Sequence, residues 1–125
     1  MTYNMIWYER GTCTTFSGKT TIEEVNEVNN KHYGDARFDK IRYQLYDFTD
    51  ADLSAVTLDD TKYPAAFDTA ATSYKPRFKA AMVVTDELGK SLCQAYIDYA
   101  KHLNNTWEMA VFESYNEAIQ WCEAK

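Results

Sequence analysis

Residues 78–84, Phe-Lys-Ala-Ala-Met-Val-Val, form an almost uninterrupted apolar run. A strand has this composition when both of its faces are covered, as in the middle of a parallel sheet. Parallel neighbours need a long crossover connection, usually a helix, so this segment already favours an α/β fold. Thr85 and Asp86 then supply an N-cap for a helix that the spacing predicts to about Leu103.

Strand composition recurs elsewhere in the chain. Residues 3–8 and 12–17 are rich in aromatic and β-branched side chains and flank a turn at Gly11, so they predict a β-hairpin. Residues 40–48 alternate between two unequal faces and predict a third strand. Residues 107–112 predict the last strand.

Helix-start signals follow these strands. Residues 20–24 contain two overlapping S/T-x-x-E capping boxes, and Gly34 is placed to end the helix that they begin. Ser114 and Glu117 form another capping box before the final helix.

One further predicted helix carries an aromatic face. Its apolar residues recur at the spacing typical of the buried side of an amphipathic helix: Tyr63, Phe67, Ala70, Ala71 and Tyr74. Pro64 belongs in its first turn, because a proline in the interior would break the helix.

The predicted element order is ββαβαβαβα. Strand–helix–strand units cross over with one hand, so we expect an α/β fold with an N-terminal β-hairpin followed by alternating βα units. The sheet should be mainly parallel and packed against helices. No linker or repeat interrupts residues 1–125, which we interpret as one domain.

The charge balance limits the classes of partner. The 125 residues carry 13 Lys and Arg against 19 Asp and Glu, a net charge of −6. Such a chain has no electrostatic reason to approach nucleic acid or anionic lipid, so neither is an expected partner. No stretch approaches the roughly 18 apolar residues of a membrane span.

Cysteine usage and the first residues indicate a compartment. The first twenty residues hold no charged segment followed by a long apolar run, as a secretory signal would. Cys13, Cys93 and Cys122 form no C-x-x-C motif, and their odd number argues against a complete disulfide framework. We therefore expect a cytoplasmic protein.

No cofactor or metal motif is complete. Gly18-Lys19-Thr20 ends like a phosphate-binding loop, but Cys13 occupies the position of the required glycine. The dinucleotide motif G-x-G-x-x-G is absent. The histidines and cysteines lack zinc spacing, and the acidic residues 47–60 lack the order of a calcium loop. We expect neither a cofactor nor a metal.

No catalytic residue is predicted. Cys93 and His102 share a predicted helix, but their spacing puts them about 180° apart. A thiol nucleophile needs its base within hydrogen-bond reach. We expect Cys93 to be a small buried hydrophobe, His102 to be a surface partner of Asp98, and His32 to interact with a helix C-terminus. Enzymatic activity is therefore disfavoured.

The acidic segment 47–60 contains no basic residue. Helix caps and a solvated loop would explain it. It is also the candidate interaction or regulatory loop, and the residues in question are Asp47, Thr49, Asp50, Asp52 and Ser54.

The aromatic content offers a second candidate site. Ten Tyr, six Phe and three Trp suit either pocket walls or interfaces. Tyr46, Phe48 and Tyr74 are the candidate lining of a pocket. An exposed aromatic surface would also allow a homodimer.

Several short pieces, in this order and spacing, resemble the SpoIIAA-like family, which is related to STAS domains. The pieces are Phe16-Ser17-Gly18, Arg37-Phe38-Asp39, Tyr43-Gln44, Asp47-Phe48, residues 79–86, Trp107-Glu108, Phe112, and Glu117-Ala118 with Trp121. The resemblance implies helices around a mainly parallel sheet. It also implies a bacterial cytoplasmic protein of a group mostly without an assigned activity.

The chain departs from that pattern at one place. Anti-sigma-factor antagonists of this fold carry Asp-Ser-Ser-Gly-like residues after the third strand, where a serine is phosphorylated. Here the chain continues from Asp47 without a serine–glycine step, and a phosphate would meet several acidic neighbours. The phosphorylation switch is therefore not carried over, and Thr49 and Ser54 are the only local hydroxyls.

Two functions follow as expectations. The first is a non-catalytic regulatory or protein-interaction domain of STAS type, with a partner that is basic at the contact. The alternative is a small apolar-ligand or lipid-binding module resembling CRAL-TRIO carriers. The alternative requires a cavity on the order of several hundred Å³.

Overall fold

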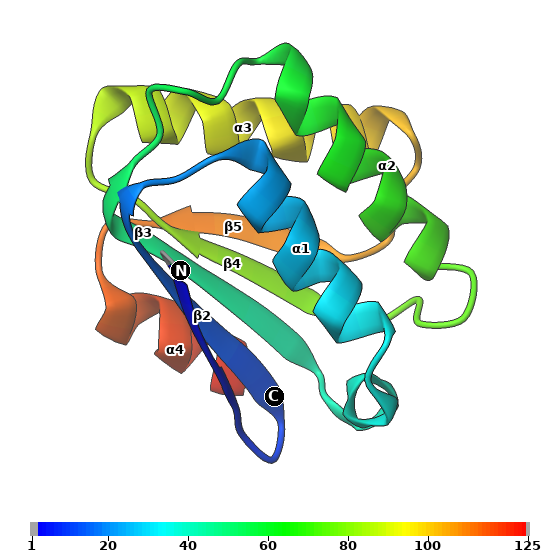
Figure 1. The fold of residues 1–125 in the computed structure, drawn as a ribbon. Coiled ribbons are helices and arrows are strands. Elements are labelled where there is room, and N and C mark those ends of the chain that lie inside the picture. Colours follow the sequence, from blue (N-terminus) through cyan, green and yellow to red (C-terminus); the bar gives the residue numbers. More distant parts are fainter. Residues whose placement is uncertain (1–2, 125) are drawn as a thin grey trace.

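A computed structural model describes residues 3–124, which form a five-stranded sheet with helices on both faces (Figure 1). The strands lie in the order β1-β2-β3-β4-β5. Strands β1 and β2 are antiparallel and every other neighbouring pair is parallel. The bounds are β1 Tyr3–Trp7, β2 Gly11–Lys19, β3 Tyr43–Asp52, β4 Lys79–Val83 and β5 Glu108–Phe112.

Helices α1, α2 and α3 cover one face of the sheet, and α4 covers the other (Figure 1). The helices are α1 Ile22–Tyr33, α2 Lys62–Ala71, α3 Glu87–His102 and α4 Tyr115–Glu123. Two short 3₁₀ helices, η1 Ala36–Lys40 and η2 Asp59–Thr61, precede β3 and α2. Among residues 3–124, no helix combines the length and apolar character needed to cross a bilayer.

The apolar run that predicted a central parallel strand is β4. It pairs in parallel with β3 on one side and β5 on the other. Met82 packs beneath α1 and α3, whereas Ala81 and Val83 pack with Ala118 and Cys122 of α4. The predicted α/β class, hairpin start and mainly parallel sheet are confirmed.

The predicted helix starts are also confirmed, because each depends on local chemistry. The Thr21 hydroxyl oxygen accepts from the Glu24 amide, and the Glu24 carboxylate accepts from the Thr21 amide. Asp86 accepts from the Gly89 amide at 3.1 Å. Each side chain satisfies a backbone N–H that has no partner within its helix.

Strand β3 is longer than predicted. It runs to Asp52 rather than ending near Phe48, because β2 continues beside it and pairs Gly18 with Ala51 and Lys19 with Asp52. The ladder of hydrogen bonds to β2 outweighs the low strand preference of aspartate. Of the predicted loop candidates, Asp47, Thr49, Asp50 and Asp52 therefore lie in a strand, and Ser54 lies beyond it.

Helix α2 faces the opposite way from the prediction. Tyr63, Phe67 and Tyr74 are 55%, 42% and 60% exposed. The buried positions of α2 are instead small or polar, and they are Pro64, Ala65, Asp68 and Ala71. The expectation that the aromatic side of α2 is its buried side is wrong, because hydrogen bonds to Asp68 hold the other side inward.

Candidate functional site

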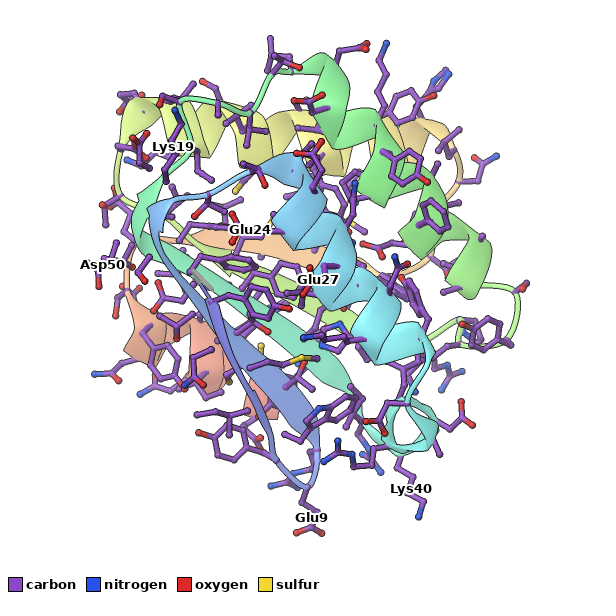
Figure 2. All side chains as sticks on the ribbon, viewed as in Figure 1. Glu9, Lys19, Glu24, Glu27, Lys40 and Asp50 are labelled. Carbon is purple, nitrogen blue, oxygen red and sulfur yellow. The ribbon has the colours of Figure 1, made fainter. Side chains whose placement is uncertain are left out.

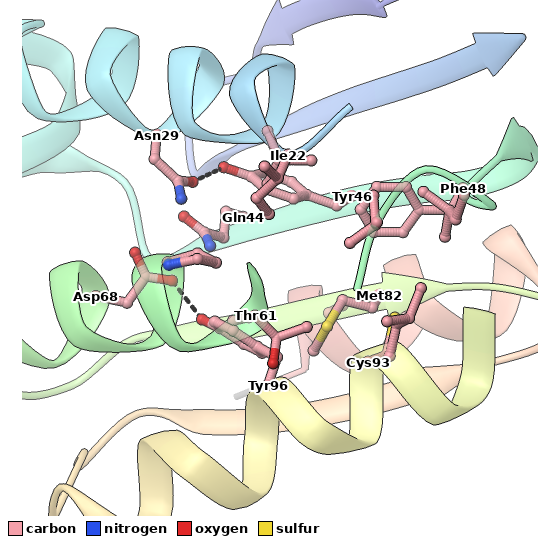
Figure 3. Close-up of a pocket in the computed structure, with 17 residues that line it drawn as sticks. Ile22, Asn29, Gln44, Tyr46, Phe48, Thr61, Asp68, Met82, Cys93 and Tyr96 are labelled. Atoms are coloured by element: carbon pink, nitrogen blue, oxygen red, sulfur yellow. Dashed lines mark hydrogen bonds between the residues drawn. The ribbon is translucent and has the colours of Figure 1, made fainter. Parts of the chain in front are cut away.

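A cavity of about 70 Å³ lies under α2, between helices α1, α2 and α3 and strands β3 and β4 (Figure 3). It forms because α2 turns small side chains towards the sheet. The two ends of the cavity differ in chemistry. Phe48, Met82 and Cys93 lie at the apolar end, and the polar end includes Asn29, Gln44, Tyr46, Asp68 and Tyr96.

Asp68 dominates the polar end. Its side chain is buried at 1% exposure, and its two carboxylate oxygens accept from the hydroxyls of Tyr33 on α1 and Tyr96 on α3. Burial raises the pKa of Asp68 to about 6, although both hydrogen bonds favour the ionised form. Burial also raises the pKa values of Tyr33 and Tyr96, which keeps both phenols protonated as donors.

The Asp68 carboxylate lacks a counter-ion. Among residues 3–124, no lysine, arginine or histidine forms an ion pair with it. Aspartate is rarely buried to this degree unless it is paired. The polar end of the cavity therefore carries a negative charge that only neutral hydroxyls stabilise.

Two amide side chains complete the polar end (Figure 3). Gln44 of β3 is only 4% exposed, and its amide group has no hydrogen-bond partner within the described residues. Asn29 of α1 accepts from the Tyr46 hydroxyl through Oδ1, and nothing between residues 3 and 124 accepts from its Nδ2. Donors and acceptors in the cavity are thus left without protein partners.

His32 lies behind this wall in a separate buried cluster. Its Nε2 is 2.8 Å from Thr12 Oγ1, and its Nδ1 is 3.3 Å from the Tyr46 hydroxyl. Burial lowers the pKa of His32 to about 4, so the imidazole is neutral at pH 7. The predicted role of His32 as a charged partner of a helix end is wrong, because the side chain is fully buried against Trp7 and Phe38.

The cysteines are buried thiols. Burial raises the pKa of Cys93 and of Cys122 to about 12. Cys13 accepts from the Tyr115 hydroxyl at 3.5 Å. Within residues 3–124, none of the three forms a hydrogen bond with a histidine, and no cluster of three or more metal-ligating side chains occurs.

A second candidate surface is the outward side of α2. Half of the exposed large apolar side chains that the structure describes come from residues 58–74. We call Tyr63 and Phe67 of α2, together with Tyr74 just beyond its end, the α2 aromatic face. Leu58 precedes η2 and lines a hollow on the α3 side instead. The Tyr63 and Phe67 rings lie 4.7 Å apart between centroids. Exposed apolar residues that gather on one element are typical of an interaction site.

The acidic candidates lie at the end of the sheet where β3 extends beyond β4, and Figure 2 shows Asp50 there. Asp47 accepts from the Thr49 amide at 2.9 Å, and Asp52 accepts from the Ser54 amide at 2.9 Å. These are local turn contacts that leave the segment solvated. Thr49, Asp50, Asp52 and Ser54 are all exposed.

Two of the three predicted pocket residues line the cavity, and the third does not. Tyr46 and Phe48 lie on the cavity wall, since both project from the same face of β3. Tyr74 lies after the end of α2, is exposed, and belongs to the α2 aromatic face instead. The cavity is also far smaller than a lipid-carrier function requires.

Sequence reasoning missed Asp68, Gln44 and Asn29. Asp68 was visible as the one carboxylate on the alanine side of α2, opposite the aromatic residues. Gln44 was visible as an amide between the apolar and aromatic residues Tyr43, Leu45 and Tyr46. The sequence could not predict that Asp68 and Gln44 are buried, because their burial depends on helices and tyrosine hydroxyls that are distant in the chain.

Comparison with solved structures finds an uncharacterized protein of the DUF3478 family from Shewanella loihica PV-4, described as having a SpoIIAA-like fold. The TM-score is 0.56, the sequence identity is 16%, and the match covers 96% of this chain and 91% of that one. No protein-family model matches the chain, and neither does any curated protein sequence. The likeness shows the fold, as the residue pattern predicted.

Proposed function

From the premise that the chain is a SpoIIAA-like, STAS-type domain, we propose that it is a non-catalytic regulatory module that binds another protein on the α2 aromatic face. The observation that carries this proposal is the orientation of α2. Tyr63, Phe67 and Tyr74 are exposed to solvent, whereas the buried positions of α2 hold smaller side chains.

The free energy of contact would come from those rings. Removing apolar surface from water is favourable by about 25 cal/mol per Å², and only the part that exceeds the entropic and desolvation costs of association appears as affinity. Tyrosine is enriched at the centres of interfaces because it combines an apolar body with a polar tip. Tyr63 and Phe67 already pack against each other, so little side-chain freedom remains to be lost on binding.

The neighbouring charges define the chemistry of the partner. An open hollow of about 590 Å³ lies beside the N-terminal end of α2, and its walls include Leu58, Asp98, His102 and the ion pair of Asp59 with Lys62, 3.1 Å apart. Asp98 forms no ion pair within residues 3–124, so it is the carboxylate there that would receive a basic side chain. The partner should therefore present an apolar segment flanked by lysine or arginine.

The acidic residues of β3 also favour a basic partner, although they lie outside the α2 aromatic face. Asp47, Asp50 and Asp52 extend the negative surface along the end of β3. Charges of this kind raise the rate of encounter with a basic partner more than they raise the affinity. A second copy of the chain is a less suitable occupant, because each copy carries a net charge of −6.

The cellular setting is part of the proposal. The resemblance to bacterial SpoIIAA-like proteins supports a bacterial cytoplasm. Cys13, Cys93 and Cys122 are all free thiols, which suits a reducing compartment.

The test compares affinity capture by three forms of the full chain from lysate of the native cells. They are the wild type, a Tyr63→Ser/Phe67→Ser variant, and a control variant, Ile6→Ser/Tyr8→Ser. The control residues are 42% and 49% exposed, which matches the α2 pair, but they lie on the β1 hairpin. Quantitative mass spectrometry measures the proteins retained.

Capture alone would not support the proposal. The expected result is a protein retained by the wild type and the control, lost at least about tenfold from the α2 variant, and released by added salt. Equal retention by all three forms would contradict it. So would loss from the Ile6→Ser/Tyr8→Ser control only.

A further inference from the structure

The polar side chain in the cavity wall that calls for an explanation is Gln44. It is 4% exposed, faces the cavity, and has no hydrogen-bond partner within the described residues. Buried amides are almost always satisfied, since an unmade hydrogen bond costs the full desolvation of the group. The side chain therefore indicates an occupant that supplies the missing bond.

The charge beside Gln44 restricts that occupant. The Asp68 carboxylate receives one hydroxyl hydrogen on each oxygen and no cation from residues 3–124. Each oxygen retains a further acceptor position. An occupant that donates hydrogen bonds and carries positive charge would satisfy this group, whereas an anion would be repelled.

The apolar end of the cavity disfavours an occupant that is polar along its whole length. Phe48, Met82 and Cys93 line it, and they offer water no strong hydrogen-bond partner (Figure 3). The volume of about 70 Å³ exceeds the 10–15 Å³ that one water needs, but it is smaller than a cavity that holds benzene. The shape suits a short molecule with one polar and one apolar end.

We infer that this cavity binds a short-chain primary ammonium ion, with its ammonium group between Asp68 and the Gln44 amide oxygen and its alkyl group among Phe48, Met82 and Cys93. The ammonium donates to both acceptors and neutralises the buried carboxylate. The ion is either a free amine or the end of a lysine side chain.

The experiment titrates the full chain with n-propylamine at pH 7 and follows the Asn and Gln side-chain amide signals by NMR. A ligand this small should bind in the millimolar range, on the order of 1 mM. Shifts of the Gln44 and Asn29 side-chain signals should accompany binding. n-Propanol should bind at least about tenfold more weakly, and propionate should not bind.

Variants identify the site. Asp68→Asn should weaken propylamine binding at least about tenfold, and Gln44→Met should weaken it by about three- to tenfold. Glu9→Gln removes an exposed carboxylate from the turn between β1 and β2 and should have no effect. A parallel titration with Nα-acetyl-lysinamide distinguishes the sources, because it competes with propylamine only if a lysine side chain reaches the cavity.

Several results would overturn the inference. Propanol binding as tightly as propylamine would show that charge plays no part. If Asp68→Asn leaves the affinity for propylamine unchanged, the amine binds at another site. If Asp68→Asn does not fold, the comparison of propylamine with propanol on the wild type decides whether the charge of the ligand contributes to binding. An absence of shifts with either ligand would leave only water in the cavity.

Discussion

At the scale of single residues, Asp68 and His32 make the stability of the protein depend on pH in opposite directions. The pKa of Asp68 is about 6 in the folded protein, against an ordinary value of 3.8. The folded state therefore keeps its proton between these values while the unfolded state loses it. This contribution lowers the free energy of unfolding as pH rises from about 4 to about 6, by up to about 3 kcal/mol.

Replacing Asp68 by Asn should remove that contribution. Urea unfolding between pH 4 and pH 7 measures the difference between the variant and the wild type, which should move in favour of the variant as pH rises. The exposed Asp98→Asn variant is the control and should follow the wild type. Parallel curves for Asp68→Asn and the wild type would show that the buried carboxylate does not titrate as described.

His32 should act in the other direction. Its pKa is about 4 in the folded protein and 6.5 ordinarily, so the unfolded state gains a proton first as pH falls. The free energy of unfolding should decrease by roughly 3 kcal/mol between about pH 6.5 and pH 4. His32→Gln should flatten this part of the curve, whereas the exposed His102→Gln should not. An unchanged slope in His32→Gln would contradict the assignment.

At the scale of elements, the sequence predicted what local chemistry determines. The capping box at Thr21, the cap at Asp86 and the apolar run of β4 each depend on neighbours in the chain or on a simple pattern. The orientation of α2 could not be predicted in this way. It depends on Asp68 meeting Tyr33 and Tyr96, which lie far apart in the sequence.

The cavity shows the same limit. Tyr46 and Phe48 were expected to line a pocket, because alternation along β3 put them on one face. Gln44 lies on that face too, but its lack of a partner became visible only when α1, α2 and α3 were in place. The length of β3 likewise depends on β2 and not on its own residues.

The start of α3 gives an element-scale prediction. A Cβ at Gly89 would lie 2.1 Å from Val84 Cγ2 and 2.5 Å from the Asp86 oxygen that caps the helix. Alanine favours helices by about 1 kcal/mol over glycine, but here the overlap prevails. Gly89→Ala should lower the free energy of unfolding by about 1–3 kcal/mol.

Urea denaturation measures the Gly89→Ala effect. Ser91→Ala, at an exposed position of the same helix, should change the stability by no more than about 0.5 kcal/mol. A Gly89→Ala variant as stable as the wild type would show that the approach of α3 to β4 is less close than described.

The two sides of α2 should differ in their tolerance of substitution. Phe67→Ser on the outward side should cost less than about 1 kcal/mol, since the side chain is partly exposed. Ala71→Leu on the inward side must fit beside Phe38 and Phe78 and should cost about 1–3 kcal/mol. Chemical denaturation measures both, and the reverse order would contradict the orientation of α2.

At the scale of the whole molecule, α2 is the element that both proposed sites share. Its outward side carries the aromatic face, and its inward side closes the cavity through Asp68. The helix packs mainly against α3 and η2 and makes few contacts with the sheet. The proposals remain separable, because Phe67 touches only the outward site and Gln44 lines only the inward one.

Site-specific photo-crosslinking in living cells measures which surface of the domain a partner protein occupies. A photoreactive residue replaces Phe67 or Tyr74 on the α2 aromatic face, and Ile6 or Asn116 elsewhere on the surface as controls. Crosslinks are expected from positions 67 and 74, and not from the controls, to a protein segment that is apolar and rich in lysine or arginine. Crosslinks from the controls alone, or from position 67 only to another copy of this chain, would contradict it.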